Sequence, residues 1–271
     1  MNFFRWMACL IVLLGIGLMA RSAGSDTADS PTISARDLAD RLSALQEGNS
    51  YTRLRLEVKQ PPDTTKVALQ LQIKERRSKS AADVLYQVLW PQERKGEAIL
   101  LSNADGGAGS RFTPPDKRST LNTSQMGEAL FDSDLSYRDL IENFFAWQNQ
   151  AIVGNELVNR VNCLILESRP GKAAASNYAS VRSWIDVRRM VPLRVEKYGT
   201  GGRLIRRIDT TRVVTDDRGH SIPAALTVHG PRTDSFTELD GSRIKHNVTY
   251  TDREFTPEGL EKISTPSSAP E

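Results

Sequence analysis

Apolar and polar residues alternate strictly in two neighbouring stretches of the chain. The stretch RLRLEVK places Leu54, Leu56 and Val58 at every second position, and KVALQLQIK continues the pattern after the turn sequence QPPDTT. Successive side chains of a β-strand point to opposite faces of a sheet, so a period of two predicts adjacent antiparallel strands with one apolar face. Such a face must be covered, which restricts the chain to folds built around a sheet.

The same alternation continues along most of the chain and is broken by turn clusters such as SKSAAD and NADGGAG. The further segments are VLYQVLWP, EAILLSN, SRFTPP, QAIVGNELV, VNCLILES, YASVRSWIDV, VPLRVEKYG, RLIRRIDTTRVV, IPAALTVHG, DSFTELD and RIKHNVTYTD. Together with the first two stretches, they predict roughly eleven strands in total, in an antiparallel meander. A sheet of that length must curl, and a curled sheet encloses either packed side chains or a ligand.

Few helices are expected beside this sheet. The stretch TISARDLADRLSALQEG has Leu38, Leu42 and Leu45 at helical spacing, which predicts one amphipathic helix. In LFDSDLSYRDLIENFFAW, Ser136 and Asp139 fit a capping box, so a second helix is predicted to begin there, with Tyr137, Ile141, Phe144 and Phe145 on one face. TPEGLEKI is compatible with a short closing helix. The expected fold class is therefore α+β, mainly antiparallel β.

The polar residues before the second helix raise the question of whether they do chemistry. Asp132 and Asp134 approach the spacing of a calcium loop, but Tyr137 stands where that loop needs glycine and Asn143 where it needs a bidentate glutamate. The glycine-rich stretches complete no dinucleotide, phosphate-loop or nucleophile-elbow motif, and the three histidines lie far apart without paired ligand spacing. We therefore predict no catalytic residue, no metal site and no cofactor.

The N-terminal residues predict export. Arg5 precedes the apolar run WMACLIVLLGIGLMA, whose length suits a secretory signal peptide better than an uncleaved anchor, which remains the alternative. Removal of residues 1–23 takes away Arg5 and Arg21 and no acidic residue, so the mature chain is nearly neutral. A nearly neutral chain gives no reason to expect a nucleic-acid partner.

Four blocks, taken in order, resemble a known family. They are LFDSDLSYRDL, IVGNELVNRVNCLILESRP, YASVRSWIDVRRMVPLRVEKYGTGGRLIRRI and RIKHNVTYTDREFTPEGL. Together they resemble the LolA-like outer-membrane lipoprotein-sorting proteins over about Leu85 to Leu260. The family motif carries over onto Phe131, Ser133, Asp134, Leu135, Ser136, Tyr137, Asp139 and Leu140. The chain departs from many relatives at Asp132 and Arg138, which leaves the cargo open.

The resemblance implies an unclosed, or half, β-barrel with a few helices forming a lid over an apolar hollow for acyl chains. The expected segments are a signal peptide (1–23), a polar linker (24–36), a LolA-like half-barrel domain (37–262) and a disordered tail (263–271). Candidate lid residues that bind lipid are Tyr137, Leu140, Ile141, Phe144 and Phe145. Candidate residues of the hollow are Leu69, Leu71, Ile73 and Leu85. For each of them, an ordinary place in the core is the alternative.

The function expected from this resemblance is that of a carrier and not of an enzyme. The protein would shield the acyl chains of a lipid or lipoprotein in the periplasm and deliver them toward the outer membrane. Its partners would be acyl chains or lipoproteins, with transient outer-membrane contact and possible contact with an inner-membrane transporter, and the protein would be a monomer. The alternatives are a periplasmic sensor or accessory subunit of an inner-membrane transporter, and an exported hydrolase.

Overall fold

The computed structural model describes residues 33–103, 108–172, 176–232, 234–265 and 267–268. The predicted signal peptide lies outside the described residues, as does the predicted linker up to Thr32. Helix α1 (Ala35–Ala44) begins two residues inside the predicted linker of residues 24–36, because the Ser34 hydroxyl oxygen caps it by accepting a hydrogen bond from Asp37 N at 3.0 Å.

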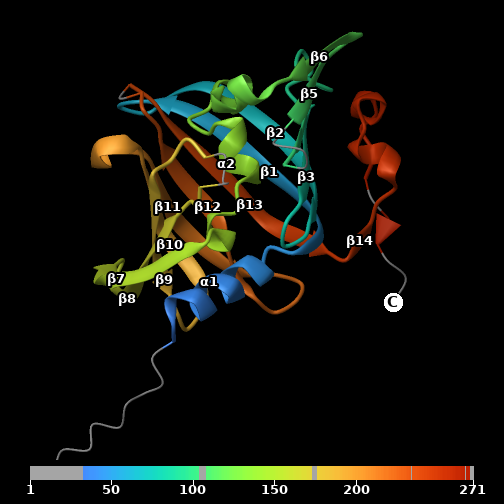
Figure 1. Cartoon of the computed structure of the whole chain (residues 1–271). Coiled ribbons are helices and arrows are strands. Elements are labelled where there is room, and N and C mark those ends of the chain that lie inside the picture. Colours follow the sequence, from blue (N-terminus) through green and yellow to red (C-terminus); the bar gives the residue numbers. More distant parts are fainter. Residues whose placement is uncertain (1–32, 104–107, 173–175, 233, 266, 269–271) are drawn as a thin grey trace, which may run out of the picture. The chain divides into compact units, whose positions relative to one another are not determined.

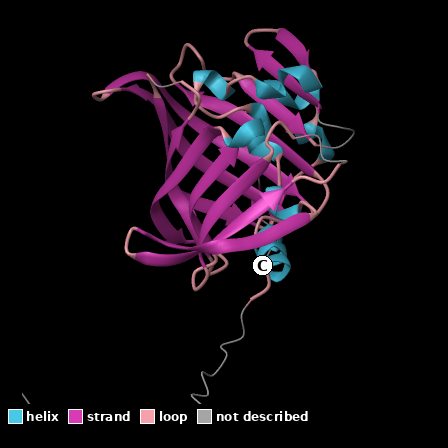
Figure 2. Cartoon of the chain, turned by 60° about the vertical axis from the view of Figure 1, so that its left-hand side comes forward, coloured by secondary structure: helices cyan, strands magenta, loops and turns pink. Residues whose placement is uncertain are grey.

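A 13-stranded antiparallel sheet dominates the described residues (Figure 1). Its strands are β1 (Gly48–Gln60), β2 (Thr64–Arg77), β3 (Ala82–Trp90), β4 (Ala98–Ser102), β5 (Ala108–Thr113), β6 (Lys117–Leu121), β7 (Asn149–Val158), β8 (Val161–Arg169), β9 (Ser180–Asp186), β10 (Val191–Tyr198), β11 (Leu204–Thr215), β12 (Ser221–His229) and β13 (Phe236–His246). The sheet curls into a half-barrel that does not close (Figure 2). The prediction of an unclosed, mainly antiparallel barrel is confirmed.

The order of the strands explains why the chain crosses the opening of the half-barrel. Strands β1 to β6 run outward to one edge of the sheet, whereas β7 forms the opposite edge and β13 returns to pair with β1. The connection from β6 to β7 must therefore pass from one edge to the other. We call this connection, residues 122–148, the lid segment. It contains η2 (Thr123–Gly127), η3 (Leu130–Asp132), α2 (Tyr137–Ile141) and η4 (Phe144–Ala146).

The inner face of the sheet carries the largest apolar cluster. Leu54 pairs with Leu71, and Leu71 pairs with Val88 on the next strand, so the three side chains share one face. Leu71 and Val88 are buried with Tyr137 and Ile141 of the lid segment in one core cluster, which Leu54 borders, and α2 therefore lies over the inner face (Figure 1). Near the other edge, α1 covers the inner face through a second cluster.

The alternating pattern located most strands, with two differences. Strand β6 was missed because Lys117 to Thr120 are polar and exposed, so they give no apolar alternation. The two segments DSFTELD and RIKHNVTYTD contribute to a single strand, β13, followed by the short β14 (Val248–Thr249). Asp240, Gly241 and Ser242 interrupt the apolar alternation in the middle of β13, so the sequence predicted two strands there and not one.

The second predicted helix is shorter than expected. Its capping box forms as predicted, but α2 ends at Ile141 because Glu142 takes an extended conformation, with φ −79° and ψ 120°. Phe144 begins a separate 3-10 turn, so the prediction that Phe144 and Phe145 share a helix face with Tyr137 is wrong. None of the helices in the described part of the chain combines the length and apolar character needed to span a membrane.

The C-terminal residues cover the outer face of β2 to β5. This segment contains η6 (Asp252–Phe255) and η7 (Pro257–Glu261), and Leu260 is buried beside Phe112 and Leu100. Lys74 donates a hydrogen bond to Ser264 Oγ at 2.7 Å, and β15 (Ser267–Ser268) pairs with β14. The prediction of a disordered tail is therefore wrong for the described residues after Lys262.

Candidate functional site

An apolar cavity of about 270 Å³ lies between the lid segment and the inner face of the half-barrel. Its wall combines strands as far apart in the sheet as β3 and β11, which only the curled face can bring together. The sheet contributes Leu54, Leu56, Leu71, Ile73, Tyr86, Ile208, Leu226, Val228 and Leu239, and the lid segment contributes Leu130, Leu135, Asp139 and Leu140. Asp139 is the one ionisable carboxyl among these lining residues.

Two of the four predicted hollow residues line this cavity. Leu71 and Ile73 do so, whereas Leu69 is buried in the same inner-face cluster without lining the cavity. The prediction that Leu85 lines the hollow is wrong, because Leu85 lies on the outer face, where it is buried with Leu260. Leu85 pairs with Lys74 in the register of β2 and β3, and neighbouring positions on a strand point to opposite faces.

The predicted lid residues separate into two groups. Leu140 lines the cavity, and Tyr137 and Ile141 are buried in the cluster beside it. Phe145 is instead buried under α1, and Phe144 contacts Phe145 and Trp147, with ring centroids 4.5 Å and 6.3 Å away. The placement of both phenylalanines on the cavity side of a lid is therefore wrong.

A buried ionic network fastens α2 to strands β10 and β11. Asp139 accepts hydrogen bonds from Lys197 Nζ at 2.6 Å and Tyr178 Oη at 2.9 Å, and Arg206 Nη1 donates to its other carboxyl oxygen. The side chains of Asp139, Lys197 and Arg206 are 1%, 2% and 7% exposed. Burial alone would raise the pKa of Asp139, but the adjacent Lys197 and Arg206 charges lower that pKa to about 2. Asp139 is therefore ionised at neutral pH.

The first residues of the family motif hold the lid segment to the turn between β12 and β13. The Asp134 carboxylate accepts hydrogen bonds from Thr237 Oγ1 at 2.9 Å and Ser235 Oγ at 3.2 Å, and Arg232 lies 3.3 Å away. A side chain at Gly230 would place its Cβ 2.9 Å from Asp134 Oδ1, so this close approach requires glycine. Asp134 is occupied by structural contacts.

Ser136→Ala should lower the free energy of unfolding by about 0.5–2 kcal/mol. The Ser136 hydroxyl oxygen accepts a hydrogen bond from Asp139 N, and Asp139 in turn accepts one from Ser136 N at 2.8 Å. Urea denaturation measures the change, with the exposed Ser124→Ala as the control. An unchanged midpoint for Ser136→Ala would show that the capping box contributes nothing measurable.

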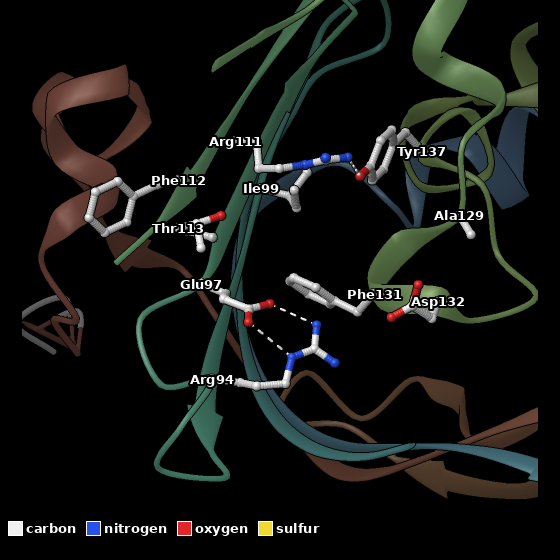
Figure 3. A pocket seen from close by; sticks show the side chains of 11 residues that line it. Arg94, Glu97, Ile99, Arg111, Phe112, Thr113, Ala129, Phe131, Asp132 and Tyr137 are labelled. Atoms are coloured by element: carbon white, nitrogen blue, oxygen red, sulfur yellow. Dashed lines mark hydrogen bonds and ion pairs between the residues drawn. The ribbon is translucent and has the colours of Figure 1, made fainter. Parts of the chain in front are cut away.

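A second pocket, of about 230 Å³, is lined by both charged and apolar side chains and lies between strands β4 and β5 and the lid segment (Figure 3). Arg94 pairs with Glu97 at 2.7 Å and lies over the ring of Phe131, while Arg111 donates to Tyr137 Oη and pairs with Glu128. Each of these arginines therefore already has a partner. Sequence reasoning missed both arginines because they lie outside the motif, which contains only Phe131 and Tyr137 among their partners.

One group of side chains has the composition of a metal site. The ligand atoms of Asp216, Asp217 and His246 lie within 4.8 Å of one another. Asp216 Oδ1, however, accepts hydrogen bonds from the backbone N of Arg218 and His220, and Asp217 Oδ1 lies 2.5 Å from His246 Nδ1. Through these contacts the three side chains stabilise the turn between β11 and β12.

A model of a family described as "Uncharacterized protein" matches residues 81–262, which is more than half of the chain. No curated protein matches the sequence. The fold is similar to that of a DUF1329 family protein from Desulfovibrio piger, with a TM-score of 0.75, 21% identity, and coverage of 83% of this chain and 97% of that one.

Two further solved structures share this architecture. A putative outer membrane lipoprotein-sorting protein domain from Vibrio parahaemolyticus has a TM-score of 0.74 and 17% identity, with 84% of this chain and 98% of that chain covered. A LolA superfamily protein from Nitrosomonas europaea has a TM-score of 0.67 and 16% identity, with 83% and 98% covered. The chain therefore belongs to the family whose model matches residues 81–262, and its fold is that of the LolA-like lipoprotein-sorting proteins.

Proposed function

We propose that this protein is a periplasmic carrier that shields the acyl chains of a lipid or lipoprotein in the cavity beneath the lid segment and delivers them toward the outer membrane. The observation that carries the proposal is the apolar lining of that cavity, which both the sheet and the lid segment supply. Burial of acyl chains is favourable by about 0.8 kcal/mol per CH₂ group, so an apolar cavity of this kind can hold them against water.

The size of the cavity supports a lid that moves. Its volume of about 270 Å³ lies below the range of roughly 300–1,000 Å³ that is common for ligand pockets. A long acyl chain therefore needs more space than the closed form offers, and displacement of α2 would provide it. The lid segment is a connection that crosses the opening of the sheet, so α2 can shift without the loss of a strand.

We propose a carrier without catalytic activity. The polar residues of the family motif are engaged in holding the lid segment: Asp134 binds the β12–β13 turn, and Asp139 binds Lys197 and Arg206. Ser136 Oγ donates a hydrogen bond to Asp139 Oδ2 at 2.5 Å. These contacts give the polar residues of the motif a structural role, so no catalytic role is needed to explain them.

The proposal predicts that the mature protein binds a fluorescent acyl probe and that Leu140→Asp weakens this binding at least tenfold. Leu140 is half-buried and lines the cavity, so an aspartate there places a charge where an acyl chain would lie. Fluorescence titration measures the affinity, and circular dichroism checks that the β-sheet is retained. Mass spectrometry of lipid extracted from gently purified protein identifies the natural cargo.

Leu157→Asp is the control for this experiment. Leu157 is 69% exposed in β7, away from the cavity lining, so its substitution should leave probe binding unchanged. If the parent protein binds no acyl probe and carries no lipid, the carrier function is wrong. Equal affinities for the parent and a folded Leu140→Asp variant would place the acyl chain elsewhere.

A further inference from the structure

We infer that Lys197 and Arg206 form a binding site for the anionic headgroup of the cargo, and that Asp139 of the lid segment occupies this site in the closed form. The ligand class is an amphiphile whose acyl chain ends in a carboxylate or a phosphate. The inference rests on the proposed carrier function and adds the charge of the cargo to it.

The donors around Asp139 have the arrangement that an oxyanion requires. Lys197 Nζ and Tyr178 Oη donate to Asp139 Oδ1, while Arg206 Nη1 donates to Oδ2. Charge-assisted hydrogen bonds of this kind are the strong ones, and they recognise carboxylates and phosphates alike. The site therefore offers three side-chain donors from the curled sheet and the loop before β9 to any oxyanion that replaces the Asp139 carboxylate.

The position of the two cations fits the headgroup of a bound amphiphile. Arg206 and Ile208 are two positions apart on β11, so their side chains share the inner face, and Ile208 lines the apolar cavity. Arg206 and Lys197 are paired across β10 and β11. Asp139 itself lines the cavity. A headgroup at the cations would therefore place its acyl chain along the apolar wall.

The local charges favour an additional or replacement anion. Two buried cations face the single ionised carboxylate of Asp139. Glu142 is the next carboxyl near Lys197, but burial raises its pKa, although Lys197 opposes this effect. Its Oε2 atom is buried without a hydrogen-bond partner among the described residues. Glu142 is thus a weaker counter-charge than Asp139.

Replacement of one anion by another would couple loading to lid opening. If α2 moved away by itself, Lys197 and Arg206 would be left without their carboxylate partner, which is costly for buried charges. An incoming anionic headgroup removes that cost because it takes over the same donors. A neutral lipid offers no such exchange, so the cavity should distinguish anionic from neutral amphiphiles.

The test compares three ligands with the same chain: dodecanoate, methyl dodecanoate and dodecyl phosphate. Each displaces a neutral fluorescent acyl probe from the mature protein at pH 8 and low salt. We expect the two anions to bind at least tenfold more tightly than the ester. In Arg206→Met this preference should shrink to less than threefold.

Arg207→Met is the matched control, since Arg207 is the next residue on β11, faces the opposite side of the sheet and pairs with Asp209 at 2.6 Å. It should keep the full preference for anions. If Arg206→Met does not fold, the comparison of acid with ester in the parent protein decides.

Equal binding of the acid and the ester to the parent would overturn the headgroup site and leave the acyl carrier standing. If the protein binds none of the three ligands and does not bind the acyl probe, the carrier function itself is overturned. Tighter binding of dodecanoate than of dodecyl phosphate would assign a carboxylate headgroup, and the reverse order would assign a phosphate.

Discussion

Asp139→Ala should lower the free energy of unfolding by about 3–5 kcal/mol, because it leaves Lys197 and Arg206 buried without their counter-charge. Both cations are less than a tenth exposed, so water cannot replace the lost carboxylate. The variant also removes the partner that Ser136 binds in the capping box. Chemical denaturation at pH 7 measures the loss for the whole domain.

The contribution of the Asp139 carboxylate should also be visible in the pH dependence of the free energy of unfolding. The folded-state pKa of Asp139 is about 2, below the value of about 3.9 in an unfolded chain. Since the folded pKa is depressed, the contribution is present above about pH 4 and is lost as the pH falls toward about 2. The size of the shift corresponds to about 2–3 kcal/mol. Asp139→Ala should lack this part of the acid-induced loss.

Asp63→Ala serves as the control for these measurements. Asp63 is paired with Lys59 at 3.2 Å but is 74% exposed, so its removal should change the free energy of unfolding by less than about 1 kcal/mol. A loss below about 1 kcal/mol for Asp139→Ala would contradict the view that this network fastens the lid segment to β10 and β11.

The fold could be predicted because its main signal is local. Strand alternation depends only on neighbouring residues, so Leu54, Leu56 and Val58 already indicated a one-sided apolar strand. The capping box was equally local, since Ser136 and Asp139 lie one helical turn apart, and the structure confirms it. The strand order is not local and was not predicted: a simple meander would leave the first and last strands at the edges, whereas β1 pairs with β13 and β6 and β7 form the edges.

The side of the sheet to which a residue points could not be predicted. Leu85 is apolar like Ile73, yet it lies on the outer face, where the C-terminal residues cover it with Leu260. Over β2 to β5 both faces of the sheet are covered, so apolar residues occur at both the inward-pointing and the outward-pointing positions of these strands. Alternation alone then no longer marks the inner face.

The ionic network could not be predicted either, for a different reason. Lys197 and Arg206 lie 58 and 67 residues from Asp139 in the chain, and each resembles an ordinary charged residue of a half-exposed strand. Only the curl of the sheet and the path of the lid segment bring them together. Arg138 and Asp132, where the chain departs from many relatives, did not mark the place where the charges meet.

The break after Ile141 leads to the second prediction with a large effect: Phe145→Ala should lower the free energy of unfolding by about 3–5 kcal/mol without changing acyl affinity. Phe145 is 2% exposed and is buried with Leu38 and Leu42 of α1, so its truncation leaves a cavity in the core. It does not line the apolar cavity beneath the lid segment.

Thermal or urea denaturation measures the stability of Phe145→Ala, and titration with the fluorescent acyl probe measures binding in the fraction that remains folded. Leu204→Ala is the control, because Leu204 is 47% exposed and its truncation should change stability by less than about 1 kcal/mol. A Phe145→Ala variant of unchanged stability but weakened probe binding would return Phe145 to the lid. Reduced stability with unchanged probe binding would instead place Phe145 in the core under α1 and outside the acyl site.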